Sequence, residues 1–168
     1  MDNPLLDLSG LPRFDRIRAE HVVDAIERVL SENRTTIGQL LADTRAFSWE
    51  TLVEPFEDLA DRLNRVWSPV AHLNAVVNSE ALRDAYLACL PKLSAYATEL
   101  GQNAGLYRAY LALAEGPEYE RMQPAQRKVI DNALRDFRLS GVALSGDCRC
   151  DSRGCVRFRI CPQILAAT

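Results

Sequence analysis

The chain has 168 residues, of which 48% are hydrophobic and 26% are charged. These values are ordinary for one soluble globular domain that buries a core of its own. Its 20 Lys and Arg against 23 Asp and Glu leave a net charge of −3 without a basic stripe, which argues against nucleic acid as a partner. The apolar runs are too short to cross a bilayer. The N-terminus lacks the basic start and apolar stretch of a signal peptide, so we expect a cytoplasmic location without membrane partners.

Charge and cysteine content both divide the chain near residue 145. Residues 1–145 hold 16 basic and 21 acidic side chains, a net charge of −5, whereas residues 146–168 hold four Arg and two Asp, a net charge of +2. Cys89 is the lone cysteine of the first region, and we expect it to pack as a small apolar group. The other cysteines crowd into the last 21 residues, at Cys148, Cys150, Cys155 and Cys161. The chain therefore reads as a body, 1–145, and a Cys/Arg-rich tail, 146–168.

The body begins with an extended lead-in and a long helix. Pro4 and Pro12 prevent an early helix in residues 1–18, whose apolar side chains should lie along the domain surface. Helical spacing of apolar residues then predicts a helix over about 19–44. Its stripe comprises Val22, Ile26, Val29, Leu30, Ile37, Leu40 and Leu41.

A second long helix follows Ser48, which is a suitable N-cap, and Pro55 is tolerable if it falls near the helix start. Its apolar residues alternate steps of four and three, the spacing of a helix packed along others. They are Leu52, Phe56, Leu59, Leu63, Val66, Val70, Leu73 and Val77. A coiled coil would show the same spacing, but Pro69 should kink or split the helix, which favours a bundle core.

Three further helices are predicted, over about 80–100, 106–115 and 124–140. Asn78 or Ser79 caps the first, Pro91 should bend it, and Gly141 is the expected C-cap glycine of the last. The inner face of the first comprises Leu82, Tyr86, Cys89, Leu90, Leu93, Tyr96, Ala97 and Leu100. The stripe of the last comprises Ile130, Ala133, Leu134 and Phe137. The predicted fold is all-α, a bundle-like arrangement of five or six helices with an irregular tail.

Charged pairs in the body indicate surface stabilisation. Asp131 and Arg135 stand four residues apart on the last helix and should form an ion pair. The densest acidic group is Glu54, Glu57, Asp58 and Asp61. Its spacing could attract a cation, but a solvated helix face opposite the apolar stripe explains it fully.

The body offers no catalytic constellation. His21 stands at a helix start and is expected to be solvated, while His72 follows Pro69 and is expected to be a hydrogen-bonded structural histidine rather than a ligand. An HExxH motif, which pairs two zinc-binding imidazoles with a glutamate base, does not occur. Two histidines and one cysteine do not support a nucleophile–base triad. We therefore assign no catalytic, cofactor-binding or metal-binding residue.

The tail allows three interpretations. Its cysteines follow C-x-C-x4-C-x5-C, but structural zinc sites usually pair their ligands as C-x2–4-C. Disulfides are the second option, although nothing indicates an oxidising compartment. The third is that residues 146–168 come from a shifted reading frame and are disordered, because Arg, Cys, Gly, Ser and Ala crowd together while Lys and Glu vanish. The composition favours the third.

Long strings of the body resemble the N-terminal part of the oligopeptidase A branch of the thimet oligopeptidase family. The most idiosyncratic are WSPVAHLNAVVNS and KVIDNALRDFRLSG, and others are NPLLDLSGLPRFDRIRAEHVVDAI and LPKLSAYATELGQNAGLYRAY. The resemblance covers about residues 3–144 in order. Beyond residue 145 the family continues in another long, charged helix, which the tail does not match.

The resemblance implies a cytoplasmic zinc metallo-endopeptidase that hydrolyses short peptides in a deep channel. Members of the family are several times longer, and their HExxH zinc site lies far downstream. The N-terminal helices form part of the channel wall, and none of the family's catalytic or metal residues maps onto residues 1–144. We therefore expect a truncated, inactive segment whose exposed apolar faces meet the missing catalytic region. A non-catalytic helical adaptor and a zinc- or redox-responsive tail remain as alternatives.

Overall fold

The computed structural model describes residues 3–42 and 47–142, and within them all regular structure is helical. The α-helices are α1 (Ala19–Ala42), α2 (Glu54–Val76), α3 (Glu80–Gly101), α4 (Ala104–Ala114) and α5 (Pro124–Leu139). A π-helical turn, η1 (Trp49–Val53), leads into α2, and a 3-10 turn, η2 (Tyr119–Arg121), precedes α5. The described part confirms the predicted all-α class.

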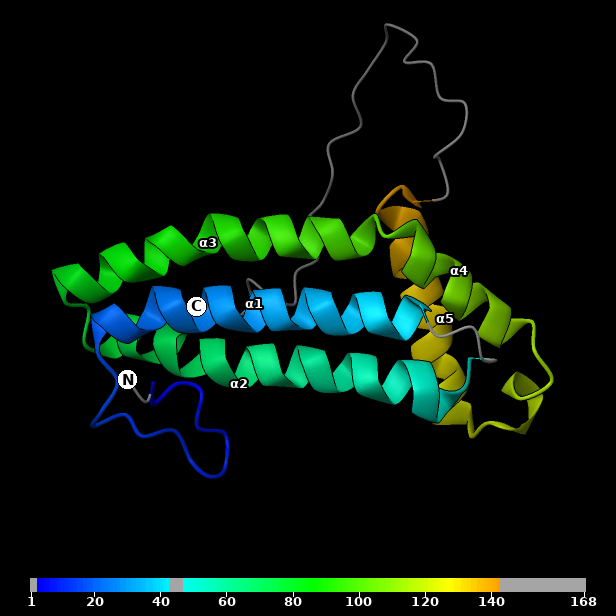
Figure 1. Ribbon diagram of the computed structural model, residues 1–168, viewed down its shortest axis with the longest axis horizontal. Coiled ribbons are helices and arrows are strands. Elements are labelled where there is room, and N and C mark those ends of the chain that lie inside the picture. The colour runs from blue at the N-terminus through cyan, green and yellow to red at the C-terminus, as the bar shows by residue number, and fades with distance from the viewer. Residues whose placement is uncertain (1–2, 43–46, 143–168) are drawn as a thin grey trace, which may run out of the picture.

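The three long helices run side by side, and the two shorter ones cross one end of them (Figure 1). Helix α1 packs against both α2 and α3, and α4 packs mainly against α5. Because α2 has two different neighbours rather than one supercoiled partner, its four-and-three spacing marks a bundle core and not an autonomous coiled coil.

Two apolar cores hold the three long helices and the two shorter helices together. The core of the long helices includes Val22, Ile26, Val29, Val66, Val70 and Cys89, all 0% exposed. The core at the α4–α5 end includes Leu52, Val53, Leu106, Tyr110, Ile130 and Phe137. Leu100 is partly buried against both cores, so the end of α3 joins them. The burial of Cys89 confirms its expected role as a small apolar group.

The predicted helix ends are largely confirmed. The Ser48 hydroxyl accepts a hydrogen bond from the Thr51 N–H, and Ser79 caps α3 through the Leu82 N–H. Pro55 falls in the first turn of α2, where its missing N–H costs nothing. Gly141 follows the end of α5 with φ 85°, a left-handed conformation that favours glycine.

One of the two expectations about proline was too strong. Pro69 does not split α2, which continues through it as one helix. Helix α3 also continues through Pro91 and is visibly curved in Figure 1, in agreement with the expected bend. An internal proline removes one backbone hydrogen bond and costs about 3 kcal/mol. Pro69 is buried, so packing within the bundle offsets that cost.

The predicted pair between Asp131 and Arg135 was wrong. The Arg135 guanidinium lies 3.2 Å from the carboxylate of Asp136, its chain neighbour. The Asp131 carboxylate instead accepts a hydrogen bond from the Tyr119 hydroxyl at 2.6 Å, which ties η2 to α5. A helix-to-turn bond thus replaces the expected pair along one helix face.

The lead-in follows the surface of the bundle, as predicted. Leu5 and Ile17 are buried, whereas Leu11 is 89% exposed and Phe14 is partly exposed. The Arg65 side chain of α2 donates a hydrogen bond to the Leu8 carbonyl, which fixes the lead-in against that helix. The lead-in therefore covers part of α2, and the loop of the lead-in around Leu11 remains in solvent.

Candidate binding groove

The structure gives His21 a local backbone role. Its Nδ1 accepts a hydrogen bond from the Arg18 N–H at 3.1 Å, and its carbonyl accepts one from the Asn3 amide at 2.9 Å. His21 therefore orders the start of α1 and anchors the lead-in there. It is half-buried rather than fully solvated.

His72 is exposed on α2, which is continuous at that point, so the expected helix interruption is absent. Its imidazole lies edge-on to the Phe14 ring of the lead-in, with ring centroids 5.6 Å apart. No hydrogen bond to the imidazole is present among the described residues, so the predicted hydrogen-bonded role of His72 was wrong, and its observed contact is the aromatic one with Phe14.

The acidic group on α2 lies in solvent. Glu54, Glu57, Asp58 and Asp61 are all exposed, in agreement with a charged outer helix face. In the described ranges, 3–42 and 47–142, no three His, Cys, Asp or Glu side chains come close enough to hold a metal ion. The four tail cysteines, Cys148 to Cys161, lie outside the described residues.

One hollow of the described surface is an apolar groove between α2 and α3, with a volume of about 520 Å³. Helix α2 lines it with Phe56, Leu59, Ala60, Leu63, Asn64, Trp67, Ser68, Ala71, His72 and Ala75. Helix α3 lines it with Tyr86, Leu93, Tyr96, Ala97 and Leu100. Among these described lining residues none is Asp, Glu, Lys or Arg.

Aromatic rings form part of the groove wall. The Trp67 and Tyr86 rings are stacked, with centroids 4.8 Å apart and planes 16° from parallel, and they join α2 to α3. Polar atoms line up along α2, where Asn64, Ser68 and His72 follow one another at steps of four residues. A surface of this kind suits an apolar partner that also offers hydrogen-bonding groups along one edge.

A second hollow, of about 510 Å³, lies under the lead-in. It shares Asn64, Ser68 and His72 with the groove and is otherwise lined by lead-in residues together with Arg65 and Pro69 of α2. These three shared residues form a ridge between the two hollows. The lead-in therefore borders the groove on its α2 side.

The floor of the groove rests on a buried asparagine that the sequence analysis did not single out. Asn33 of α1 is 0% exposed, and its Nδ2 donates to the carbonyl of Leu59 at 3.1 Å. Burial raises the pKa of Tyr96, and the Asn33 side chain opposes that shift. Leu59 and Tyr96 both line the groove, so Asn33 couples α1 to its floor. In the sequence, Asn33 is a polar residue within the apolar stripe from Ile26 to Ile37, and this position could have indicated its burial.

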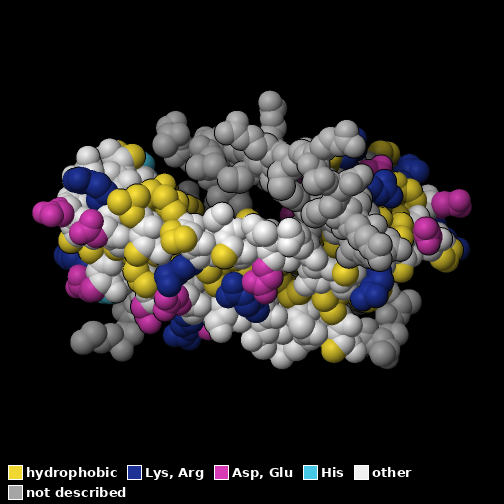
Figure 2. Space-filling view, turned by 90° about the horizontal axis from the view of Figure 1, so that it is seen from above, with side chains coloured by type: hydrophobic (Ala, Val, Ile, Leu, Met, Phe, Trp, Pro, Cys, Tyr) yellow, Lys and Arg dark blue, Asp and Glu magenta, His cyan; other side chains and the backbone are white. Residues whose placement is uncertain are grey.

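The side of α3 that meets α1 is closed by charged pairs. The Lys92 ammonium lies 2.8 Å from Glu27, and the Arg34 guanidinium lies 2.8 Å from Glu99. Figure 2, which looks down on α3, shows basic and acidic side chains next to each other near the middle, and hydrophobic side chains gathered where α3 begins. The charged pairs thus lie on the flank of α3 toward α1, whereas the residues of α3 that line the groove are uncharged.

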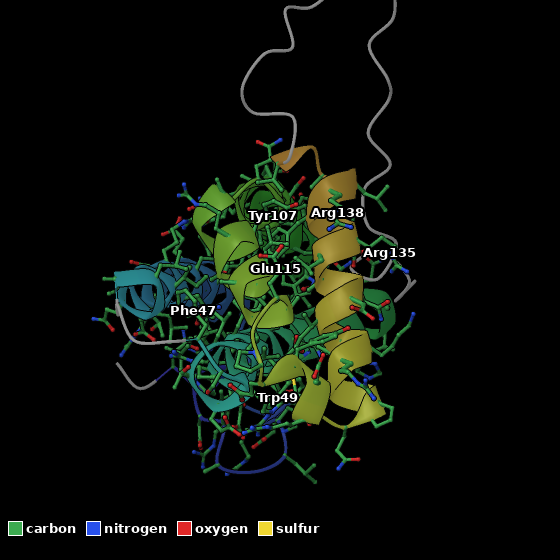
Figure 3. All side chains as sticks on the ribbon, turned by 90° about the vertical axis from the view of Figure 1, so that its right-hand side faces the viewer. Phe47, Trp49, Tyr107, Glu115, Arg135 and Arg138 are labelled. Atoms are coloured by element: carbon green, nitrogen blue, oxygen red, sulfur yellow. The ribbon has the colours of Figure 1, made fainter. Side chains whose placement is uncertain are left out.

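The α4–α5 end is an aromatic packing site. Figure 3 shows Tyr107 on α4 and Glu115 just after it, beside the helix α5 that carries Arg135 and Arg138, with Trp49 at the start of η1. The Tyr107 ring lies edge-on to Phe137, with centroids 6.1 Å apart. This end positions α4 and α5 against the long helices.

None of the described helices is long and apolar enough to cross a membrane.

Comparison with known proteins matches the helical body. The chain is 51% identical to oligopeptidase A of Haemophilus influenzae over 145 residues, 86% of this chain and 21% of that protein. It is 46% identical to oligopeptidase A of Escherichia coli over 144 residues, again 86% and 21% of the two chains. It is 34% identical to a probable cytosolic oligopeptidase A of Arabidopsis thaliana over 147 residues, 88% and 21% of the two chains. The chain thus spans about a fifth of the length of these relatives.

The family model of the neurolysin/thimet oligopeptidase N-terminal domain matches residues 26–149. That stretch starts inside α1 and includes every later helix and the whole groove lining. The resemblance inferred from the sequence strings is thereby confirmed. The chain belongs to the neurolysin/thimet oligopeptidase family, of which it contains the N-terminal domain.

Proposed function

We propose that the chain is the N-terminal region of a zinc metallo-endopeptidase that hydrolyses short peptides, and that its helices form part of the substrate channel wall. The observation that carries this proposal is the match of residues 26–149 to the family's N-terminal domain. The names of the relatives, which call them oligopeptidases, support peptides as the substrate class.

The chain alone is proposed to be inactive. The described residues do not fit a zinc site, because they bring no three His, Cys, Asp or Glu side chains together. The sequence also lacks the HExxH motif. We therefore assign this chain a structural role, which is to support and shape the channel.

The exposed apolar surface is proposed to pack against the catalytic region of the full-length enzyme. Supporting this are the uncharged groove lining and several large apolar side chains in solvent. Val76, Val77, Leu87 and Leu139 are each more than half exposed. Where exposed apolar side chains form a contiguous patch, the patch usually marks an interaction site.

The functional unit is proposed to be the body, 1–145, with the tail, 146–168, outside it and derived from a shifted reading frame. The change of composition at residue 145 supports this division. Reading the gene past codon 145 in all three frames tests it: a family-like helix in another frame supports the shift, and an open frame shared with relatives contradicts it. A cytoplasmic location is also proposed, supported by the cytosolic relative of Arabidopsis thaliana.

A fusion experiment tests the peptidase assignment. Residues 1–145 are joined to the downstream part of the Haemophilus influenzae oligopeptidase A, and cleavage of a quenched-fluorescent short peptide is followed. We expect the fusion to cleave the peptide and to lose activity with a metal chelator, while the 168-residue chain does not cleave it. Chelator-sensitive cleavage by the 168-residue chain itself would overturn the proposed inactivity. A folded but inactive fusion would instead favour the helical adaptor.

A further inference from the structure

The groove between α2 and α3 has the length of a single helix. Its α2 wall extends from Phe56 to Ala75, which at 1.5 Å per residue is about 29 Å. The α3 wall runs antiparallel to it, so Leu100 lies at the same end as Phe56. An amphipathic helix of about 20 residues would fill the groove and meet both walls.

The chain leaves the described fold beside one end of this groove. Helix α5 ends at Leu139, and Ser140 packs so closely on Gly101 that a Cβ on that glycine would lie 2.7 Å from the Ser140 Oγ. Gly101 follows Leu100, which lines the groove. Whatever follows Val142 therefore starts next to the end marked by Phe56 and Leu100.

We propose that this groove is the seat of one amphipathic helix, supplied in the relatives by the segment that directly follows the region matched here. This inference rests on the proposed function, because it makes the groove an internal contact of the full-length peptidase. The relatives have about four fifths of their length outside the match, which leaves ample chain for such a segment. Its position beside the groove gives it a high effective concentration there.

The point of entry gives the seated helix a direction. The described chain ends beside Gly101 and Leu100, at the end of the groove that Phe56 also marks. A segment that continues from there enters the groove at this end. The incoming helix therefore runs from the Phe56 end toward the Ala75 end, parallel to α2.

The stacked pair of Trp67 and Tyr86 provides a reporter near the middle of the groove. The probe is a synthetic peptide with the 26 residues that follow the matched region in the Haemophilus influenzae oligopeptidase A. A scrambled peptide of the same composition is the control. Binding to the 168-residue chain is followed by Trp fluorescence in a Trp49→Phe variant, and peptide helicity is followed by circular dichroism.

A matched pair of substitutions locates the binding site. Ala60→Arg places a long cation on the groove wall, whereas Ala88→Arg makes the same change on an exposed α3 position outside the lining. We expect the native peptide to bind at micromolar concentration and to gain helicity, and the scrambled peptide to bind at least tenfold more weakly. Ala60→Arg should weaken binding at least tenfold, and Ala88→Arg less than twofold.

Three results would overturn the inference. One is absence of binding up to about 1 mM peptide, and another is equal binding by the Ala60→Arg and Ala88→Arg variants. The third is a dimer in sedimentation that only Ala60→Arg dissociates, since a second copy would then occupy the groove. An active fusion enzyme combined with any of these results would refute the helix seat and leave the peptidase assignment standing.

Discussion

The two sides of the α2–α3 pair differ although the same helices build both. Toward α1, Val66, Val70 and Cys89 are 0% exposed and ion pairs close the edge. Away from α1, Trp67 and Tyr86 remain partly exposed in an uncharged groove. Helix α2 thus carries one apolar stripe that α1 buries and a second, partly exposed stripe that contacts α3 and lines the groove.

This difference separates the residues that stabilise the fold from those that remain available to bind a partner. A stripe that is buried by α1 contributes the transfer free energy of its side chains to the stability of this region. A stripe left in contact with water contributes much less to the stability of the bundle, and its apolar character agrees with the proposed binding of a partner helix. Substitutions on the two sides should therefore have different effects.

The largest effect is expected from Ile26→Ala on the α1 side. Ile26 is 0% exposed, and truncating such a side chain typically costs about 2–5 kcal/mol through lost transfer free energy and a cavity. Urea unfolding followed by circular dichroism measures it. The matched change on the groove side, Leu63→Ala, should cost clearly less, and equal losses would break the distinction between the sides.

The next effect is expected from Asn33→Ala. This change removes the hydrogen bond from Asn33 to the Leu59 carbonyl inside the core, and we expect a loss of about 1–3 kcal/mol in the free energy of unfolding. Asn64→Ala, on the exposed groove rim, should change stability by less than about 0.5 kcal/mol. If Asn33→Ala proves neutral, the buried amide does not hold α1 to the groove floor.

Much of the fold could be predicted from the sequence because it depends on local patterns. Helical spacing, Ser48, Ser79 and Gly141 located the elements and their ends within a few residues. The split at Pro69 was predicted wrongly because the rule for proline counts only the local loss of a backbone hydrogen bond. Burial of the Pro69 ring adds a stabilising contribution from tertiary packing. The hydrogen bond from Tyr119 to Asp131 was missed for a similar reason, since Tyr119 belongs to η2, a different element from the helix that contains Asp131.

The groove itself could not be predicted from periodicity. Residues 56, 59, 63, 66 and 70 read as one stripe, although Leu59, Val66 and Val70 are buried while Phe56 and Leu63 are only partly so. Which part of a broad apolar face meets α1 depends on how three helices are rotated about their axes. That rotation is set by packing between elements distant in sequence, which a single helical pattern does not encode.

A moderate effect is expected from the N-cap of α3. Ser79→Ala removes the hydroxyl that accepts from the Leu82 N–H, and loss of such a cap costs about 1 kcal/mol. Ser94→Ala, on an exposed position inside the same helix, should be neutral or slightly stabilising. Thermal unfolding of the two variants in parallel distinguishes a cap from a general Ser→Ala effect.

A smaller, pH-dependent effect is expected where α1 meets α2. Hydrogen bonds from Arg28 and then Arg62 lower the pKa of Glu32 from its ordinary value of 4.5. A lowered pKa in the folded state stabilises the protein above the unfolded value and loses that stabilisation as the pH falls through the folded value. Glu32 is partly exposed, so solvent screening keeps the effect small.

Urea midpoints of the native chain and of Glu32→Gln across pH 3–7 measure this effect. The native chain should be the more stable at pH 7, and the difference should shrink toward zero as the pH falls below about 4.5. A difference that is independent of pH would show that Glu32 acts through packing rather than through its charge.

The smallest effect on stability is expected from Ala60→Arg in the groove. Ala60 is exposed and lies in a helix that tolerates Arg well, so the free energy of unfolding should change by less than about 0.5 kcal/mol. The same variant is expected to lose binding of the helical peptide. A large loss of stability would show that the groove is already part of the folded core.

The contrast between the sides can be tested most directly by hydroxyl-radical footprinting, read by mass spectrometry at Trp67 and Tyr86. The measurement compares the 168-residue chain with the fusion of residues 1–145 to the downstream part of the Haemophilus influenzae relative. We expect both rings to be oxidised readily in the 168-residue chain and to be protected at least severalfold in the fusion, while buried Tyr110 stays protected in both. Equal oxidation of Trp67 and Tyr86 in the two proteins would contradict the claim that the groove is an internal contact of the full-length enzyme.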